Sequence, residues 1–101
     1  MPAYLIVNYN IDDADAYKEY QKGAAPALGI GSKSKLLVLE HHSDVVEGDT
    51  AGSNTVVLEF ESREEAKAIY DSGDYQAVLP TRLNATSSHF AVIVDGFTMP
   101  S

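Results

Sequence analysis

The chain has 101 residues, 15 acidic against 7 basic side chains, a net charge of −8 and no cysteine. This length predicts a single domain over residues 1–101, and the acidic balance without a cluster of Lys and Arg argues against nucleic acid as a partner. The missing cysteines exclude disulfides and thiolate metal sites.

No apolar run approaches the ~20 residues that cross a bilayer, so we expect no membrane contact. The start of the chain also lacks a basic leader followed by a cleavage pattern. The sequence therefore predicts a cytoplasmic location.

The first 42 residues predict a strand, a helix and a second strand. Residues 3–9 and 35–42 are rich in β-forming side chains, and residues 3–9 alternate clearly between two faces. Between these strands, Asp12 is the expected N-cap of a helix that Gly23 and Pro26 end or kink. The tyrosines of this helix are expected to pack in the core or at its rim.

A polar loop over residues 43–54 precedes the clearest strand of the chain, residues 55–61. Ser62 is the expected N-cap of the next helix, because a glutamate follows three positions later in a capping box. Gly73 is placed to end that helix in the left-handed conformation.

A short further helix is expected, with Asp74 as its N-cap and with an end or a kink at Pro80. Residues 89–94 complete the pattern as a strand. The order β-α-β-β-α-β is typical of the ferredoxin-like fold. The sequence therefore predicts an α+β domain whose four-stranded antiparallel sheet carries helices on one face.

The sheet face without helices should be strongly apolar. Strand alternation assigns to it Ile6, Val57, Ala91 and Ile93, together with Leu37 and Leu39. We expect a homodimer to bury this face, because a small domain rarely leaves such a surface in water. The alternative is that the loop over residues 43–54 folds across it.

Several segments resemble a known bacterial family. They are PAYLIVNYNIDDADAYKEY, VVEGD, VVLEFESREEAKAIYDSGDYQAV, Arg82 and the terminal VIVDG. Together they are similar to the domain of unknown function 1330, in the dimeric α/β-barrel superfamily. The resemblance implies a dimeric barrel, in a superfamily with small cofactor-free monooxygenases, lactone isomerases and haem-degrading enzymes. Residues 29–42 depart from the family pattern, which usually has a glycine turn and an aromatic, basic strand there.

Three polar side chains form the candidate site. We expect the first and third strands to be adjacent and parallel, with the fourth antiparallel beside the first, so that Asn8, Glu59 and His89 meet on the face away from the helices. A desolvated Glu59 carboxyl would have a raised pKa and could exchange a proton with His89. The alternative is a structural hydrogen bond between Glu59 and His89, within a subunit or across the dimer interface.

Two further side chains are candidates for ligand binding. Tyr4 is expected on the face away from the helices. Arg82 resembles the arginine of the family and could hold an anionic ligand through two hydrogen bonds. Alternatively, Arg82 pairs with Asp71, Asp74 or another surface acid.

No motif in the sequence indicates a metal or a nucleotide cofactor. His41 and His42 are adjacent on a predicted strand, so they point to opposite faces and are expected at the surface or the interface. A weaker alternative joins one of them to His89 and Glu59 as a metal site.

The sequence thus predicts a homodimer that binds a small organic molecule without a cofactor and performs proton transfer or oxidation on it. The assigned residues are Glu59 as base, His89 as its partner, and Tyr4, Asn8 and Arg82 as positioning groups. The alternative is a non-enzymatic dimerisation domain that acts as a scaffold or a sensor partner.

Overall fold

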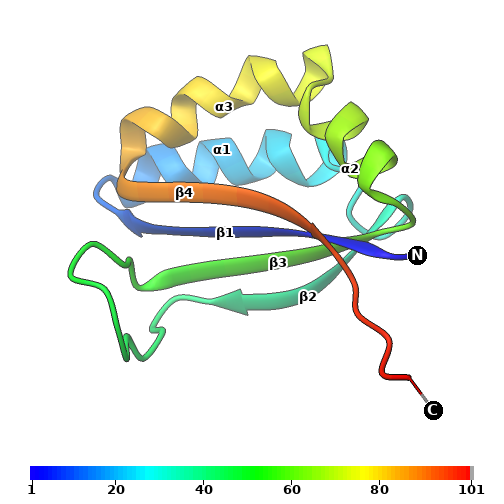
Figure 1. Ribbon diagram of the computed structural model, residues 1–101. Coiled ribbons are helices and arrows are strands. Elements are labelled where there is room, and N and C mark those ends of the chain that lie inside the picture. Colours follow the sequence, from blue (N-terminus) through cyan, green and yellow to red (C-terminus); the bar gives the residue numbers. More distant parts are fainter. Residues whose placement is uncertain (101) are drawn as a thin grey trace.

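The computed structural model describes residues 1–100, which form an α+β arrangement of one four-stranded sheet and three helices. The strands are β1 (Ala3–Ile11), β2 (Ser34–Glu40), β3 (Asn54–Phe60) and β4 (Thr86–Asp95). The helices are α1 (Ala14–Ala27), α2 (Arg63–Tyr70) and α3 (Gly73–Ala85). The sheet has the order β2-β3-β1-β4, and the helices lie on one side of it (Figure 1). The ferredoxin-like prediction is confirmed. Within residues 1–100, no helix is long and apolar enough to span a bilayer.

The orientation of the central strands differs from the prediction. β1 and β3 are adjacent but antiparallel, with Tyr4 opposite Glu59 and Asn8 opposite Thr55. α1 carries the chain back so that β2 runs in the direction of β1, and β3 then returns between them. The predicted parallel pair is therefore wrong, and the end of β1 meets the start of β3.

α1 begins and ends differently from the prediction. Its N-cap is Asp13 rather than Asp12, and the helix continues through Gly23 and Pro26. A Cβ atom on Gly23 would lie 2.7 Å from Cγ1 of Val78, so the glycine lets α3 approach α1 closely. Its role is close packing between helices rather than helix termination.

The boundary between α2 and α3 is partly as predicted. Ser62 caps α2 through its side-chain oxygen, which confirms the prediction. Gly73 does not adopt the left-handed conformation and is instead the first residue of α3. The N-cap of α3 is Ser72 rather than Asp74. α3 also continues through Pro80, because α3 lies against α1 and its buried residues pack in the core, and this packing outweighs one missing backbone hydrogen bond.

The hydrophobic core fills the space between the helices and the sheet. It consists of Leu5, Val7, Tyr9, Tyr17, Tyr20, Ala24, Leu28, Leu58, Phe60, Ala66, Tyr75 and Leu79. Four of these buried side chains are tyrosines, whose hydroxyl groups need hydrogen-bond partners inside the protein. The core therefore contains hydroxyl groups as well as apolar side chains.

The other side of the sheet, which we call the open face, carries no helix. Its residues are Tyr4, Ile6, Asn8, Lys35, Val38, Glu40, Thr55, Val57, Glu59, Phe90, Val92 and Val94. Ile6 and Val57 lie there as predicted. Ala91 and Ile93 do not, because they pair with Val7 and Leu5 on the helix side. Both faces of β4 are apolar, so alternation alone could not distinguish them.

β2 shows the same ambiguity. Leu39 pairs with Val56 on the helix side, so its predicted place on the open face is wrong. Leu37 lies where the register between β2 and β3 shifts. Because β2 is apolar at successive positions, its sequence predicts neither which side chains lie on which face nor the position of its bulge.

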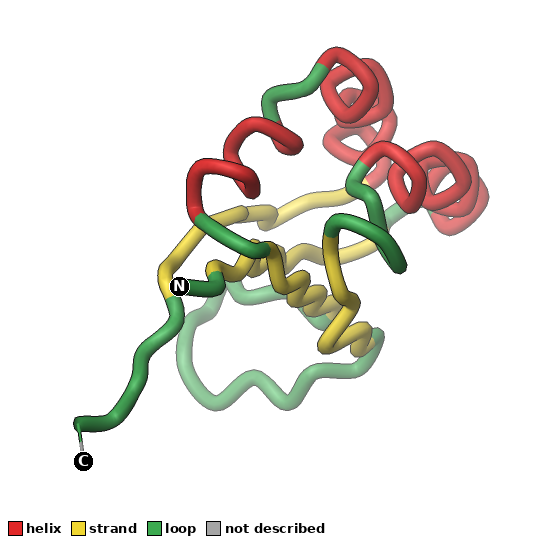
Figure 2. The backbone as a smooth tube through the Cα atoms, turned by 90° about the vertical axis from the view of Figure 1, so that its right-hand side faces the viewer, coloured by secondary structure: helices red, strands yellow, loops and turns green. Residues whose placement is uncertain are grey.

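The loop between β2 and β3 covers the open face only at Asn8, which is 8% exposed and hydrogen-bonds to Gly52. It leaves the end of the sheet, and it and the C-terminal segment both extend on the side away from the helices (Figures 1 and 2). Phe90 remains 48% exposed and Val92 44% exposed. The alternative in which the loop buries this face is therefore wrong for the single chain.

Candidate functional site

The predicted trio Asn8, Glu59 and His89 does not come together. Glu59 lies opposite Tyr4, which in turn pairs with Val94 of β4. His89 precedes Val94 along the same strand by a distance of about 16 Å, at ~3.3 Å per residue. The prediction that Glu59 and His89 exchange a proton directly within one subunit is therefore wrong. The cause is the antiparallel pairing of β1 with β3.

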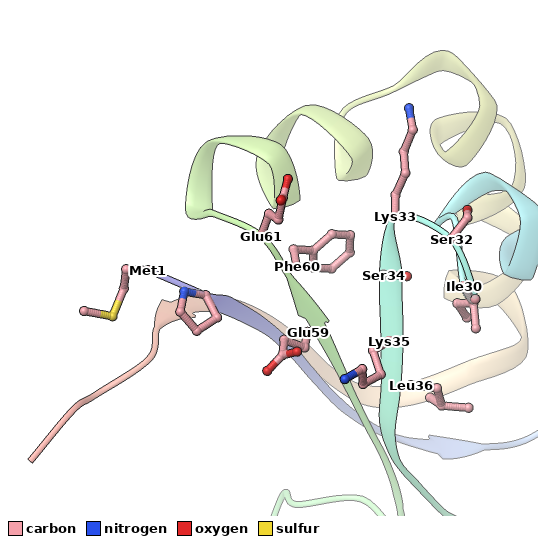
Figure 3. A pocket seen from close by; sticks show the side chains of 12 residues that line it. Met1, Ile30, Ser32, Lys33, Ser34, Lys35, Leu36, Glu59, Phe60 and Glu61 are labelled. Atoms are coloured by element: carbon pink, nitrogen blue, oxygen red, sulfur yellow. The ribbon is translucent and has the colours of Figure 1, made fainter.

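Glu59 instead lines an open groove at the edge of the sheet (Figure 3). The hydroxyl of Tyr4 donates to its carboxylate at 3.2 Å, and Lys35 stands opposite it on β2. Desolvation and then the Glu59 carboxylate raise the pKa of Tyr4. The groove measures about 660 Å³ and also includes Met1, Pro2, residues 30–34, Leu36, Phe60 and Glu61.

Asn8 holds the end of the loop between β2 and β3. Its amide nitrogen donates to the carbonyl of Gly52 at 3.0 Å, and its amide oxygen accepts from the backbone of Gly52 at 2.6 Å. A Cβ atom on Gly52 would clash with the carbonyl group of Tyr9, so only glycine fits. Both ends of the Asn8 amide are engaged, and its role in ligand binding stays a prediction.

The histidines lie at the surface, as expected for His41 and His42. His41 Nδ1 lies 2.6 Å from the amide oxygen of Asn54, which is buried at the start of β3. In the part of the chain that the structure describes, no three His, Asp or Glu residues form a group that could hold a metal ion. The alternative metal site from His89, Glu59 and one of His41 and His42 is therefore wrong within one subunit.

Arg82 is the one charged side chain among the buried residues of the range 1–100. Only 2% of it is exposed, and its guanidinium carbon lies 5.0 Å from the ring centre of Tyr9 and 5.9 Å from that of Tyr20. Neither Nε nor Nη1 has a hydrogen-bond partner. No carboxylate of residues 1–100 forms an ion pair with Arg82, so the predicted alternative, a pairing with Asp71 or Asp74, is wrong.

The charge of Arg82 is costly where it lies. Burial by itself lowers the pKa of Arg82, but the surrounding tyrosines, with Tyr75 and Tyr20 first, raise it above the ordinary value. An arginine guanidinium keeps its proton even when it is buried, so Arg82 is positive. An isolated buried charge costs several kcal/mol, of which two aromatic rings recover about 1–2 kcal/mol each. A negative group near Arg82 would offset the remainder.

A cavity of about 240 Å³ lies between α1 and the sheet, and it opens to solvent beside Leu36 and Leu39, which are 39% and 48% exposed. Its walls combine the rings of Tyr9, Tyr17, Tyr20 and Tyr75 with Leu5, Val7, Gln21, Ala24, Ala25, Leu28, Ile30, Leu36, Leu39, Val56 and Leu58. Arg82 packs on the rings of Tyr9 and Tyr20 and is not itself a lining residue, so it stands one aromatic layer behind the wall. The cavity is apolar with a positive charge at its back.

The tyrosine hydroxyls form two hydrogen-bonded pairs. The hydroxyl oxygens of Tyr9 and Tyr17 lie 2.5 Å apart, and those of Tyr20 and Tyr75 lie 2.8 Å apart. Burial raises the pKa of Tyr9 and that of Tyr20 well above the ordinary value, so both remain protonated at neutral pH. No carboxylate or imidazole lines the cavity within the described residues. The site therefore supplies donors and a cation rather than a base.

Sequence reasoning did not assign the cavity tyrosines or Asn54 to the site. It interpreted the helical tyrosines as packing, because their spacing fits a buried helix face. The signal that could have found them was the residue type: hydroxyl-bearing rings stand at core positions in place of Leu or Phe, and the chain has 6 tyrosines and no tryptophan. A run of buried hydroxyls indicates a polar interior.

The fold and the cavity together define a class of protein: a small ferredoxin-like domain with a pocket between helices and sheet and a free outer sheet face. The family model described as "Domain of unknown function (DUF1330)" matches residues 2–97. The chain belongs to this family, which confirms the resemblance. No protein with a curated description matches the chain.

Solved structures with a similar fold come from several bacteria. A protein of unknown function from Rhodopseudomonas palustris is 14% identical with a TM-score of 0.76, covering 97% of this chain and 84% of that chain. A dimeric ferredoxin-like protein of unknown function from Thermobifida fusca is 15% identical with a TM-score of 0.62, covering 94% and 91%. A dimeric protein of unknown function with a ferredoxin-like fold from Bacteroides fragilis is 14% identical with a TM-score of 0.59, covering 94% and 96%. These likenesses show the fold, and two of these proteins are described as dimeric.

Proposed function

We propose that this protein is a homodimer that binds a small organic anion in the cavity between α1 and the sheet. The observation that carries the proposal is Arg82, a buried cation with two side-chain nitrogens that lack a hydrogen-bond partner and with no ion-paired acid within residues 1–100. Active and binding sites are where proteins retain such costly charges. A bound anion supplies the missing negative charge.

The cavity limits the size and character of the ligand. Its volume of about 240 Å³ equals the share of roughly eight water molecules in the liquid. The aliphatic and aromatic walls suit an apolar body, and the tyrosine hydroxyls suit one hydrogen-bond acceptor. A small carboxylate or enolate with a hydrocarbon or aromatic body fits these properties.

The geometry supports binding more directly than proton transfer. The described lining residues include no carboxylate or imidazole, and the raised pKa values of Tyr9 and Tyr20 make these hydroxyls weak acids that stay protonated. Glu59 and His89 both lie outside the cavity and far apart in one subunit. Catalysis by this pair is therefore not part of the cavity's chemistry and stays a prediction. A pure scaffold would not need the cavity or the buried charge.

Self-association through the open face is the second part of the proposal. Apolar side chains of β1, β2, β3 and β4 gather there, and Phe90, Val92 and Val94 are between 37% and 48% exposed. A second copy of the chain offers the same surface, as a two-fold interface requires. The dimeric proteins with a similar fold support this arrangement.

Titration calorimetry with benzoate and its neutral near-isostere benzamide tests the ligand class. We expect the natural protein to prefer benzoate and Arg82→Gln to lose that preference. Benzoate affinity should fall about tenfold or more, because the guanidinium attracts the anion across one aromatic layer in a medium of low dielectric. Arg63→Gln is the matched control, because Arg63 pairs with Asp95 at the surface. Equal affinity of Arg82→Gln and the natural protein for benzoate would contradict the proposal.

A further inference from the structure

We infer that Asn54 is a positioning residue, which orients the tyrosine hydroxyls so that Tyr9 offers its hydrogen to an anionic oxygen in the cavity. The inference rests on the proposed binding of an anion and adds the groups that select it. It assigns the recognition of the anionic oxygen to Tyr9, with Arg82 supplying the longer-range charge.

Asn54 links the surface to the tyrosines of the cavity. Only 1% of its surface is exposed, at the first position of β3. Its amide nitrogen donates to the hydroxyl of Tyr17 at 3.5 Å, and its amide oxygen lies 2.6 Å from Nδ1 of His41. An amide oxygen only accepts, so Nδ1 of His41 carries the hydrogen of this contact.

This contact sets the direction of the hydrogen bonds that follow. A hydroxyl that accepts a hydrogen bond becomes a better donor, so Tyr17, which accepts from Asn54, is the stronger donor to Tyr9. The series then runs from His41 through Asn54 and Tyr17 to Tyr9. The hydroxyl hydrogen of Tyr9 is the last of the series, and it has no hydrogen-bond acceptor within residues 1–100.

Both the position and the charge of its surroundings favour Tyr9 as the final donor. Tyr9 lines the cavity, and its ring lies against the guanidinium of Arg82. An anion accepting from Tyr9 would complete four donors in series and would lie near the unpaired cation. A neutral ligand that donates a hydrogen bond gains nothing from this order. The site therefore selects acceptors over donors.

Two conservative variants test the order of the donors. With benzoate as the probe, we expect Tyr9→Phe to weaken binding about tenfold or more, the usual value of a hydrogen bond to a charged group. Tyr17→Phe leaves the Tyr9 hydroxyl in place and should weaken binding less than about threefold. The phenylalanine ring keeps the packing of either tyrosine, so both variants should fold. A larger effect at Tyr17, or none at Tyr9, would overturn the inference.

Asn54→Asp tests the positioning role itself. A carboxylate accepts from Tyr17, so the Tyr9 hydrogen turns to Tyr17 and is withdrawn from the ligand. We expect affinity for benzoate to fall about tenfold or more, whereas affinity for benzyl alcohol, which can donate to Tyr9, changes less than about twofold. Equal losses for both probes would indicate a merely structural role and overturn the inference.

Asn10→Asp is the charge-matched control for that experiment. The side-chain oxygen of Asn10 accepts from the backbone of Ser53, a role that a carboxylate retains, and it makes no contact with the tyrosine series. It should leave benzoate affinity within about threefold, since its added charge lies outside the core. If Tyr9→Phe binds benzoate normally while Arg82→Gln does not, the inference about donors fails and the anion site stands. If the natural protein does not prefer benzoate, both fail.

Discussion

The two faces of the sheet reverse the usual distribution of polar and apolar groups. The helix side is buried, yet it holds a guanidinium and four tyrosine hydroxyls. The open face is exposed, yet Phe90, Val92 and Val94 make it apolar. Buried polar groups and exposed apolar patches are the informative departures from the general rule. The helix side therefore indicates ligand binding, and the open face indicates association with a second subunit.

Matched phenylalanines on the two faces should give the largest contrast. Phe60 is 2% exposed on the helix side and Phe90 is 48% exposed on the open face. Phe60→Ala should lower the free energy of unfolding by about 3–5 kcal/mol, because it leaves a cavity in the core. Phe90→Ala should cost the monomer less than ~1 kcal/mol. Urea unfolding at low protein concentration measures both, and equal losses would remove the distinction between the faces.

A charge on the open face should break the dimer without unfolding the subunit. Val92→Asp places like charges together across a two-fold interface, so the dimer dissociation constant should rise about 100-fold, or ~2.7 kcal/mol. Val46→Asp is the control, because Val46 is 90% exposed on the loop rather than on the sheet. Analytical ultracentrifugation measures the constant. A dimer unaffected by Val92→Asp would place the interface elsewhere.

The buried tyrosines should make the helix side sensitive to alkali. Burial raises the pKa of Tyr9 and of Tyr20 above the ordinary value, so the fold favours their neutral forms. The contribution of these two tyrosines to the free energy of unfolding is fully present below about pH 10, the pKa of tyrosine in the unfolded chain. Above that pH the contribution falls by ~1.4 kcal/mol per pH unit for each tyrosine.

Urea unfolding at increasing pH, followed by tyrosinate absorbance, measures this loss. Tyr9→Phe should remove about half of the slope that the two tyrosines contribute. Tyr4 on the open face should ionise without unfolding, because it is only half-buried. Ionisation of every tyrosine in the folded protein near pH ~10 would contradict the assignment of a tight tyrosine-lined core.

Removing the buried charge should stabilise the ligand-free protein. Arg82→Met keeps a long apolar side chain and removes a guanidinium without an ion-paired acid, so the free energy of unfolding should rise by about 1 kcal/mol while benzoate binding weakens. Arg82→Lys keeps the charge and should show no such gain. Thermal unfolding without ligand measures the difference. A clear loss of stability in Arg82→Met would indicate that Arg82 is structural.

Glu59→Gln should have the smallest effect. Glu59 is half-buried and accepts a single hydrogen bond, from Tyr4, which an amide oxygen also accepts. The free energy of unfolding should change by less than ~0.5 kcal/mol, and benzoate affinity should not change. Calorimetry with benzoate measures the second quantity. Loss of binding would return the candidate site to the groove around Glu59.

Local patterns predicted the elements and the fold class well. The alternation of β1, the N-cap at Ser62 and the order of strands and helices all depend on neighbouring residues, which the chain itself specifies. Predictions that depended on helix termination were less accurate. Gly23 and Pro80 lie inside helices, because packing between α1 and α3 outweighs local helix-breaking preferences, and Gly73 begins α3 rather than ending α2.

The candidate site was only partly predictable. Arg82 was identified as a candidate, but its isolation from every carboxylate of residues 1–100 depends on how α3 packs over the tyrosines of β1 and α1. Glu59 and His89 were placed together because the direction of one strand was wrong. Residue types indicate which chemistry is available, whereas topology decides which groups meet.

By itself, the sequence determined an α+β ferredoxin-like domain, an apolar sheet face without helices and a family, because periodicity and capping act over a few residues. Only the tertiary structure decided that Arg82 is buried without an acid, that four tyrosines line the core, and that Asn54 joins His41 to Tyr17. These contacts join segments far apart in the chain, and their energies depend on burial. Burial exists only once the helices have packed on the sheet.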